Sequence, residues 1–201
     1  PKNPKEFDES KKGEVEFRNV SFKYPDAEEY ILKDISFKVE KGENVAIIGM
    51  TGSGKSTLLR CLNLLEIPTG GKVFYTGEEI LDKSFDERKF RSKFGMVFQN
   101  FNLFENKNIL ENCTLAQELV LGVDKKEAEK TAREYLNLVG MEAYVNAKPS
   151  QISGGQKQRV AIARAIFRKP EVYIFDDSFS ALDYKTDRIL RAELKKETRG
   201  V

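Results

Sequence analysis

Hydrophobic and polar positions alternate in the first part of the chain. Val15 and Phe17 begin an alternation that slips by one residue at Asn19 and then resumes, and a second alternation runs through residues 35–39. A period of two predicts strands of an antiparallel sheet, and the slip predicts a β-bulge. The preceding residues 1–12 are polar and charged with two prolines, which is typical of a linker.

Two continuous apolar runs interrupt this alternation. Residues 44–48 precede a glycine-rich stretch, after which residues 55–65 carry leucines at helical spacing, and residues 172–175 form the second run. Continuous apolar runs of this length are typical of strands buried on both faces in a parallel sheet. We therefore expect a strand, a loop and a helix in succession around the glycines, and a second buried strand near the end of the chain.

The middle of the chain has a helical pattern. Between residues 90 and 140 apolar positions recur at helical spacing, and one stripe stops at Gly140, a natural helix C-cap. A further helix is predicted over residues 156–168, ended by Pro170. We expect a helical subdomain at about residues 100–168 inserted into an α/β domain of residues 13–201. The stripe consists of Ala128, Ala132, Tyr135, Leu136 and Val139.

Charge and cysteine content narrow the possible partners. The chain has 34 Lys and Arg against 32 Asp and Glu, so it lacks the basic excess that binds nucleic-acid phosphates, and no nucleic-acid partner is expected. Two cysteines without any histidine suggest neither a zinc site nor a disulfide framework, and are typical of buried thiols in a reducing compartment. No apolar run reaches the roughly 18 residues of a membrane-spanning helix, and none is typical of a signal peptide. We expect a soluble, cytoplasmic chain.

A glycine-rich motif follows the first apolar run and fits the Walker A pattern G-x-x-x-x-G-K-[ST] of P-loop NTPases. Its glycines let backbone N–H groups converge on phosphates, and the helix N-terminus adds partial positive charge. We expect Lys55 to reach the β- and γ-phosphates of ATP and Ser56 to bind Mg²⁺; the alternative is a plain flexible turn. The predicted ATP-binding residues are Gly49, Met50, Thr51, Gly52, Ser53, Gly54, Lys55, Ser56 and Thr57.

Two carboxylates, Asp176 and Asp177, follow the second apolar run. The carboxyl end of a buried strand is where open α/β sheets place their ligand chemistry. Asp176 fits the Walker B role of holding Mg²⁺, and Asp177 is placed to orient or deprotonate the attacking water. Such a pair is by itself more often a helix or turn start, and it gains its weight from the Walker A motif.

A third motif, residues 153–156, lies between these two motifs. It opens the helix that is predicted before the second apolar run. By itself it fits a plain helix start, whose free N–H groups point outward. In its position downstream of Walker A and just upstream of Walker B, it resembles the signature of ABC transporter nucleotide-binding domains. The resemblance covers the chain from Glu14 onward. The motif consists of Ser153, Gly154, Gly155 and Gln156.

This resemblance implies a partner and a place of action. In the family, two nucleotide-binding domains pair head to tail, with each ATP held between one chain's Walker A and the other chain's signature. Hydrolysis then releases the clamp, because the γ-phosphate joins the two sides only while it is present. The family's domains dock onto transmembrane domains at the inner face of the cell membrane.

The resemblance also implies roles for residues outside the three motifs. Tyr24 resembles the aromatic residue that stacks on adenine, although an alternating strand also explains a core tyrosine. Gln99 resembles the Q-loop glutamine that contacts Mg²⁺ and the lytic water, although residues alone favour a solvated loop side chain. A final element resembles the family's D-loop, which lines the dimer seam. It consists of Ser180, Ala181, Leu182 and Asp183.

The chain departs from the family pattern at two catalytic positions. Asp177 stands where the family usually has glutamate, and a carboxylate drawn back by one methylene predicts slow hydrolysis, as in degenerate exporter sites. The chain has no histidine and ends at Val201, before the strand that carries the family's switch histidine, which suggests a truncated domain. The expected function is a weakly hydrolysing transport ATPase. The alternative is an essentially non-hydrolytic nucleotide-binding module.

Different segments of the chain resemble different subfamilies. Residues 14–57 and 172–201 resemble exporter domains, whereas residues 58–170 resemble polar amino-acid importer ATPases. We therefore hypothesise a chimera with seams near Thr57 and Pro170. A non-transport ABC protein is disfavoured, because the chain has neither a long coiled coil nor a basic arm. The transported substrate and the direction of transport stay open at this point.

Overall fold

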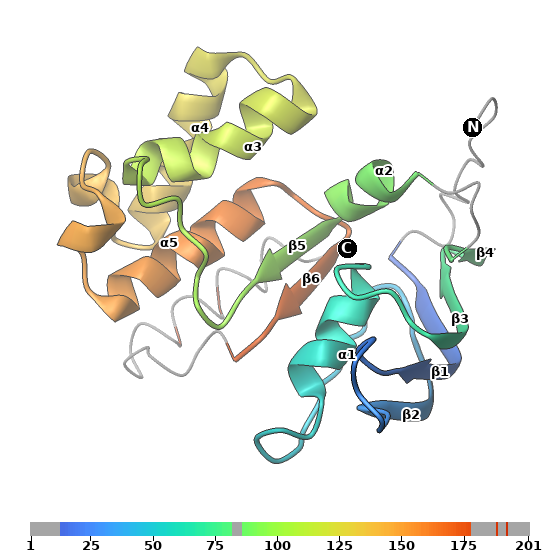
Figure 1. Ribbon diagram of the computed structural model, residues 1–201. Coiled ribbons are helices and arrows are strands. Elements are labelled where there is room, and N and C mark those ends of the chain that lie inside the picture. Colours follow the sequence, from blue (N-terminus) through green and yellow to red (C-terminus); the bar gives the residue numbers. More distant parts are fainter. Residues whose placement is uncertain (1–12, 82–85, 178–187, 189–191, 193–201) are drawn as a thin grey trace. The chain divides into compact units, whose positions relative to one another are not determined.

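The computed structural model describes residues 13–81, 86–177, 188 and 192 (Figure 1). The described chain divides into two compact units, one of residues up to Phe94 and one beginning at Gly95. Each unit has its own sheet and its own helices, and each is described by itself below. The predicted linker lies outside the described residues.

The first unit contains a four-stranded antiparallel sheet in the order β2-β1-β3-β4. Its strands are β1 (Val15–Phe22), β2 (Leu32–Val39), β3 (Gly70–Tyr75) and β4 (Glu78–Glu79). Alternate residues of β1 are buried, as the period of two predicts. The pairing with β2 shifts between Phe17 and Val20, where Asn19 has a φ of 52°. The predicted antiparallel strands and the bulge are confirmed.

Strand β3 was not predicted, and its first residues depend on glycine. Gly71 has a φ of 84°, and a methyl group added there would lie 2.3 Å from the carbonyl oxygen of Asn19. Only glycine therefore lets β3 cross the bulged part of β1 this closely. The six-residue strand lacks a clear alternation, so its place in the sheet depends on a contact about fifty residues away in sequence.

Two helices complete the first unit: α1 (Lys55–Leu62) and α2 (Glu87–Ser92). Helix α1 begins where it was predicted but ends three residues early, because Leu64 adopts a left-handed φ of 56°. The Leu64 carbonyl accepts a 2.6 Å hydrogen bond from Arg91 at the end of α2. Tyr75, Phe90 and Phe94 form an aromatic cluster with ring centroids 4.5–5.5 Å apart.

The strand predicted at residues 44–48 is not formed. These residues have no regular secondary structure, and Val45 and Ile48 are 51% and 93% exposed. An apolar run becomes a buried strand only when neighbouring strands take its backbone hydrogen bonds and other elements cover its faces. Residues 44–48 join neither of the two sheets, so the run keeps its apolar side chains in solvent.

The second unit is built around β5 (Phe94–Val97), which begins at the unit boundary, and β6 (Val172–Phe175). The two strands run in the same direction (Figure 1), and the Asp176 N–H donates to the Val97 carbonyl at 3.0 Å. Strand β6 confirms the predicted second run. Strand β5 falls in a region predicted to be helical, because four residues are too few to show a period.

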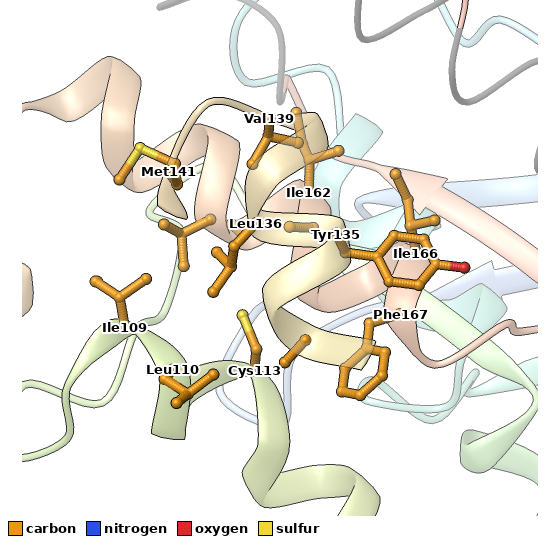
Figure 2. Close-up of a cluster of buried hydrophobic side chains, with 14 of the residues drawn as sticks. Ile109, Leu110, Cys113, Tyr135, Leu136, Val139, Met141, Ile162, Ile166 and Phe167 are labelled. Carbon is orange, nitrogen blue, oxygen red and sulfur yellow. The ribbon is translucent and has the colours of Figure 1, made fainter. Parts of the chain in front are cut away.

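The part of the second unit up to Asp177 contains three α-helices: α3 (Ile109–Leu121), α4 (Lys125–Leu138) and α5 (Gly154–Phe167). The 3-10 turns η2 (Glu142–Tyr144) and η3 (Pro149–Gln151) join α4 to α5. Side chains from all three helices meet in one buried cluster (Figure 2), and the predicted stripe on α4 belongs to it. Leu136, at its centre, is fully buried.

No helix among the residues that the structure describes is long and apolar enough to cross a bilayer. Both thiols are buried and unpaired by disulfides. Burial raises the pKa of Cys61 and of Cys113 to about 12 each, so both stay protonated at neutral pH. The prediction of ordinary buried thiols is confirmed.

Candidate functional site

The Walker A loop leads into α1 through residues that need positive φ. Gly52 has a φ of 82° with open space around it, and Gly54, the N-cap of α1, has a φ of 85°. A methyl group on Gly54 would lie 3.0 Å from the Ile31 side chain. The Ser53 N–H donates to the Met50 carbonyl at 3.1 Å and closes the turn. The loop thus holds the first amides of α1 beside an open glycine, an arrangement that suits a phosphate.

Lys55, the first residue of α1, turns its side chain back over the loop. Its Nζ donates to the carbonyl oxygens of Gly49 and, over 2.8 Å, of Met50. The ammonium group therefore lies at the loop backbone, with Ser56 next to it in the first turn of α1. One positive charge and one hydroxyl thus lie at the start of α1, and their contacts to phosphate and Mg²⁺ stay predictions.

Tyr24 follows β1 in the same unit and is 37% exposed. Its ring packs edge-on against Phe22 at 5.0 Å, and its hydroxyl lies 3.5 Å from a carboxylate oxygen of Glu66. A fully buried core tyrosine, the alternative from sequence, does not describe this side chain. The remaining exposed ring surface is compatible with stacking against a flat ligand.

Gln99 lies in the second unit at the tip of a turn that directly follows β5. The Phe101 N–H donates to the Phe98 carbonyl at 3.0 Å, which leaves Gln99 and Asn100 exposed at the middle of the turn. The side chain of Gln99 can therefore reach a ligand, as its predicted role requires. Its exposure fits the alternative of a solvated loop glutamine equally well.

The signature residues form the N-terminus of α5. Ser153 is the N-cap: its hydroxyl accepts from the Gln156 N–H at 3.3 Å, and the Gln156 side chain accepts from the Ser153 N–H at 2.8 Å. This reciprocal capping box uses the side chains of both residues. The amides of Gly154 and Gly155 come before the first helical hydrogen bond, which Lys157 donates to Ser153. The motif therefore presents backbone N–H groups at a rigid helix start.

The two carboxylates after β6 differ in their surroundings. Asp176 is 6% exposed and continues the pairing of β6 with β5 through its backbone, whereas Asp177 is exposed and has a left-handed φ of 49°. Aspartate tolerates this conformation better than most residues. The chain therefore turns sharply between a buried carboxylate and an exposed one. The predicted D-loop begins three residues later and lies outside the described residues.

Two of the predicted elements meet in the second unit around a cleft of about 510 Å³. Its walls are residues 99–103 of the Gln99 turn, Glu105, and Ile152, Gly154 and Lys157 at the start of α5. The turn and the signature of one chain thus share a cleft, although they are about fifty residues apart in sequence. The Walker A residues and Tyr24 belong to the first unit.

Sequence reasoning missed the side chains that support the Gln99 turn. Arg164 of α5 donates to the carbonyls of Phe101 and Asn102 at 2.7 and 2.8 Å. Asn112 of α3, which is 1% exposed, bonds both backbone groups of Phe104. A charged residue within the apolar stretch of α5 indicates a buried arginine that needs acceptors. Which acceptors it finds depends on the fold.

Comparisons with known proteins identify the family of the chain. A family model described as ABC transporter matches residues 32–180. The glutamine transport ATP-binding protein GlnQ of Geobacillus stearothermophilus is 46% identical over 172 residues, which cover 86% of this chain and 70% of that protein. The methionine import ATP-binding protein MetN 1 of Oceanobacillus iheyensis is 43% identical over 185 residues, covering 90% of this chain and 54% of that protein.

Solved structures show the same fold. A dimeric ATP-binding cassette in a post-hydrolysis state, bound to ADP and Pi, superimposes with a TM-score of 0.83 at 38% identity, covering 92% of this chain and 84% of that one. A bacterial Atm1-family ABC exporter with ATP bound gives a TM-score of 0.82 at 28% identity, covering 93% of this chain and 33% of that one. Because the family match spans most of the chain and the importer relatives exceed 40% identity, this chain belongs to the ABC transporter family, as its ATP-binding cassette.

Proposed function

We propose that this cassette binds Mg·ATP at its Walker A loop and hydrolyses it slowly, within a head-to-tail dimer that powers a transporter. The observation that carries the proposal is Lys55. Its ammonium group lies against the loop carbonyls at the N-terminus of α1, where the glycines leave room for a phosphate. When a phosphate binds here, the Lys55 ammonium group donates to its charged oxygen atoms instead of the loop carbonyls. These hydrogen bonds are charge-assisted and therefore stronger.

The other contacts to the nucleotide are proposed from the positions of the motifs. Tyr24 stacks on the adenine ring, and Ser56 contributes its hydroxyl to Mg²⁺. Asp176 and Gln99 are predicted Mg²⁺ ligands by their motif positions, and the ion, which prefers oxygen ligands, would supply charge neutralisation when bound. Gln99 also orients the attacking water, and Asp177 accepts its proton. These roles are supported by the motif positions and by the exposure of Gln99 and Asp177.

A second copy of the domain completes the site. The Gly154 and Gly155 amides and the Ser153 hydroxyl contact the γ-phosphate held by the partner's Walker A loop, and Gln156 stabilises this helix start through its capping box. The D-loop residues 180–183 line the seam between the copies. The similar cassette solved as a dimer with ADP and Pi supports this arrangement.

The transporter that this cassette serves is an importer. Its relatives are named for glutamine transport and methionine import, at 43–48% identity. Transmembrane domains are the second class of partner, and they hold the cassette at the cytoplasmic face of the membrane. The hypothesis of a chimera stays a prediction. It is tested by comparing residues 14–57, 58–170 and 172–201 separately with importer and exporter domains, and it fails if all three give one subfamily.

Phosphate release under saturating Mg·ATP tests the proposed hydrolysis. We expect slow release from the unmodified chain, and a rise of up to about a hundredfold in Asp177→Glu, because the longer side chain moves the carboxylate toward the water by about an ångström. The matched control Asp177→Asn keeps the shorter length without the base and is expected to release no phosphate. Release that is equally fast from the unmodified chain and from Asp177→Glu would show that Asp177 is not the limiting group.

A second candidate function is nucleotide binding without hydrolysis. The shortened carboxylate at Asp177 favours it. The same assay separates the two functions. If the unmodified chain and Asp177→Glu both bind ATP but neither releases phosphate at any protein concentration, the chain is a nucleotide-gated binding module.

A further inference from the structure

The turn that carries Gln99 has an unfavourable backbone conformation. Phe101 and Asn102, the two residues that close it, have φ values of 61° and 46°. Left-handed φ is unfavourable for residues with a Cβ atom, and two in succession are uncommon. Asparagine tolerates this conformation better than most residues but phenylalanine does not, so the local sequence explains only part of the shape of the turn. Something outside the turn must stabilise it.

The guanidinium group of Arg164 provides this stabilisation. Its Nη2 donates to the Phe101 carbonyl at 2.7 Å, and its Nη1 donates to the Asn102 carbonyl at 2.8 Å. The planar fork thus spans two successive carbonyls of the left-handed pair. Burial lowers the pKa of Arg164, with a small opposite effect from nearby Cys113 and a further lowering by Arg168. A charge buried at this place needs both acceptors.

The chain on both sides of the turn is also held. Before Gln99, the Val97 carbonyl accepts from the Asp176 N–H at 3.0 Å, at the end of β6. After the turn, the Asn112 side chain accepts from the Phe104 N–H at 2.7 Å and donates to the Phe104 carbonyl at 3.1 Å. Gln99 therefore lies in a short span between two fixed points, and Arg164 is the side chain that fixes the conformation inside that span.

We propose that Arg164 is the positioning residue for Gln99. By locking Phe101 and Asn102, it holds the Gln99 turn as one wall of the cleft whose opposite wall is the start of α5, the helix to which Arg164 itself belongs. Gln99 thereby keeps a fixed position relative to the signature of its own chain. The effect on turnover rests on the function proposed above, whereas the effect on the turn does not.

Hydrogen exchange followed by mass spectrometry tests the structural half without any nucleotide. The reporters are the Phe101 and Asn102 amides, which donate to the Phe98 and Asn100 carbonyls at 3.0 and 2.7 Å. In Arg164→Met we expect these amides to exchange at least about tenfold faster, because hydrogen bonds from a charged donor are lost. In Arg164→Lys, which retains the charge and can reach one carbonyl, we expect an intermediate rate.

Arg159→Met is the matched control, because Arg159 is another half-buried arginine of α5 and contacts Met141 instead of the turn. It is expected to leave the exchange of both reporter amides unchanged. Unchanged exchange in both Arg164 variants would overturn the proposal. So would equal acceleration throughout α3, since this would show a general loss of stability; a thermal melt of each variant identifies that case.

Turnover tests the functional half. In Arg164→Lys we expect kcat to fall several-fold while KM for ATP stays within about twofold, because the Walker A loop is unchanged. In a Gln99→Ala background the same substitution is expected to have no further effect on kcat, since residues that act through one another are not additive. Additive losses would assign Arg164 a merely structural role. If the unmodified chain shows no turnover, the proposed hydrolysis fails, while the exchange experiment still decides the position of the turn.

Discussion

The Walker A loop and the Gln99 turn both depend on left-handed backbone, but they obtain it by different means. The loop uses glycines: Gly52 and Gly54 adopt φ values above 80° without a steric cost. The turn uses Phe101 and Asn102, which adopt φ values of 61° and 46° while Arg164, more than sixty residues away, binds their carbonyls. The first conformation is encoded within a few residues. The second is stabilised by a side chain of α5.

Because of this difference, we expect the two regions to be sensitive to different substitutions. The Walker A loop is sensitive to substitutions at its own glycines. The Gln99 turn is sensitive to changes in distant helices, because Arg164 on α5 and Asn112 on α3 support it and its neighbouring segment. A binding element that is locally encoded and a turn that depends on helix packing can therefore be disturbed independently.

The largest effect is expected from Leu136→Ala, which removes a fully buried side chain from the cluster between α3, α4 and α5. A cavity of this kind costs about 2–5 kcal/mol of unfolding free energy, measured by urea denaturation. Leu119→Ala is the matched control, since Leu119 is 77% exposed on α3, and it is expected to change the unfolding free energy by less than about 0.5 kcal/mol. Equal effects of the two substitutions would show that the cluster does not support this unit.

A pair of glycine substitutions sharpens the comparison. Gly54 and Gly154 both open helices, but only Gly54 has a positive φ, and a methyl group there meets Ile31 at 3.0 Å. Gly54→Ala is therefore expected to lower the unfolding free energy by about 1–2 kcal/mol. Gly154→Ala, with open space around it, is expected to stay within about 0.5 kcal/mol of the unmodified chain. Thermal and urea denaturation of both variants measure this, and a larger loss in Gly154→Ala would reverse the comparison.

The smallest effect concerns pH and the start of α3. A hydrogen bond from the Asn108 backbone, and secondarily one from Lys107, holds the pKa of Glu111 below its ordinary value of 4.5. Because the folded-state pKa is the lower one, Glu111 stabilises the fold above pH 4.5, and this stabilisation is lost as pH falls through the folded value. Glu111→Gln keeps the capping box but not the charge.

We therefore expect the unfolding free energy of Glu111→Gln to change less between pH 7 and about pH 3 than that of the unmodified chain. Urea denaturation at both pH values measures the difference. A larger loss of unfolding free energy at acid pH in the variant would mean that the Glu111 carboxylate does not stabilise the fold.

Much of the site was predictable because its motifs are local. The Walker A glycines and the helix start at Gly154 and Gly155 each depend on residues close by in the sequence. Strands β3 and β5 were missed because short strands gain stability from partners and not from their own pattern. The strand predicted at residues 44–48 was wrong for the same reason, since an apolar run cannot supply its own hydrogen-bonding neighbours.

Titration of the full chain with ATP in the presence of Mg²⁺, followed by calorimetry, tests the central claim most directly. We expect saturable binding at one site per chain, and a loss of about a hundredfold in affinity in Lys55→Ala, because hydrogen bonds from a charged donor to the phosphates are removed. Binding of equal affinity in both proteins would contradict the assignment of residues 49–57 as the phosphate-binding loop.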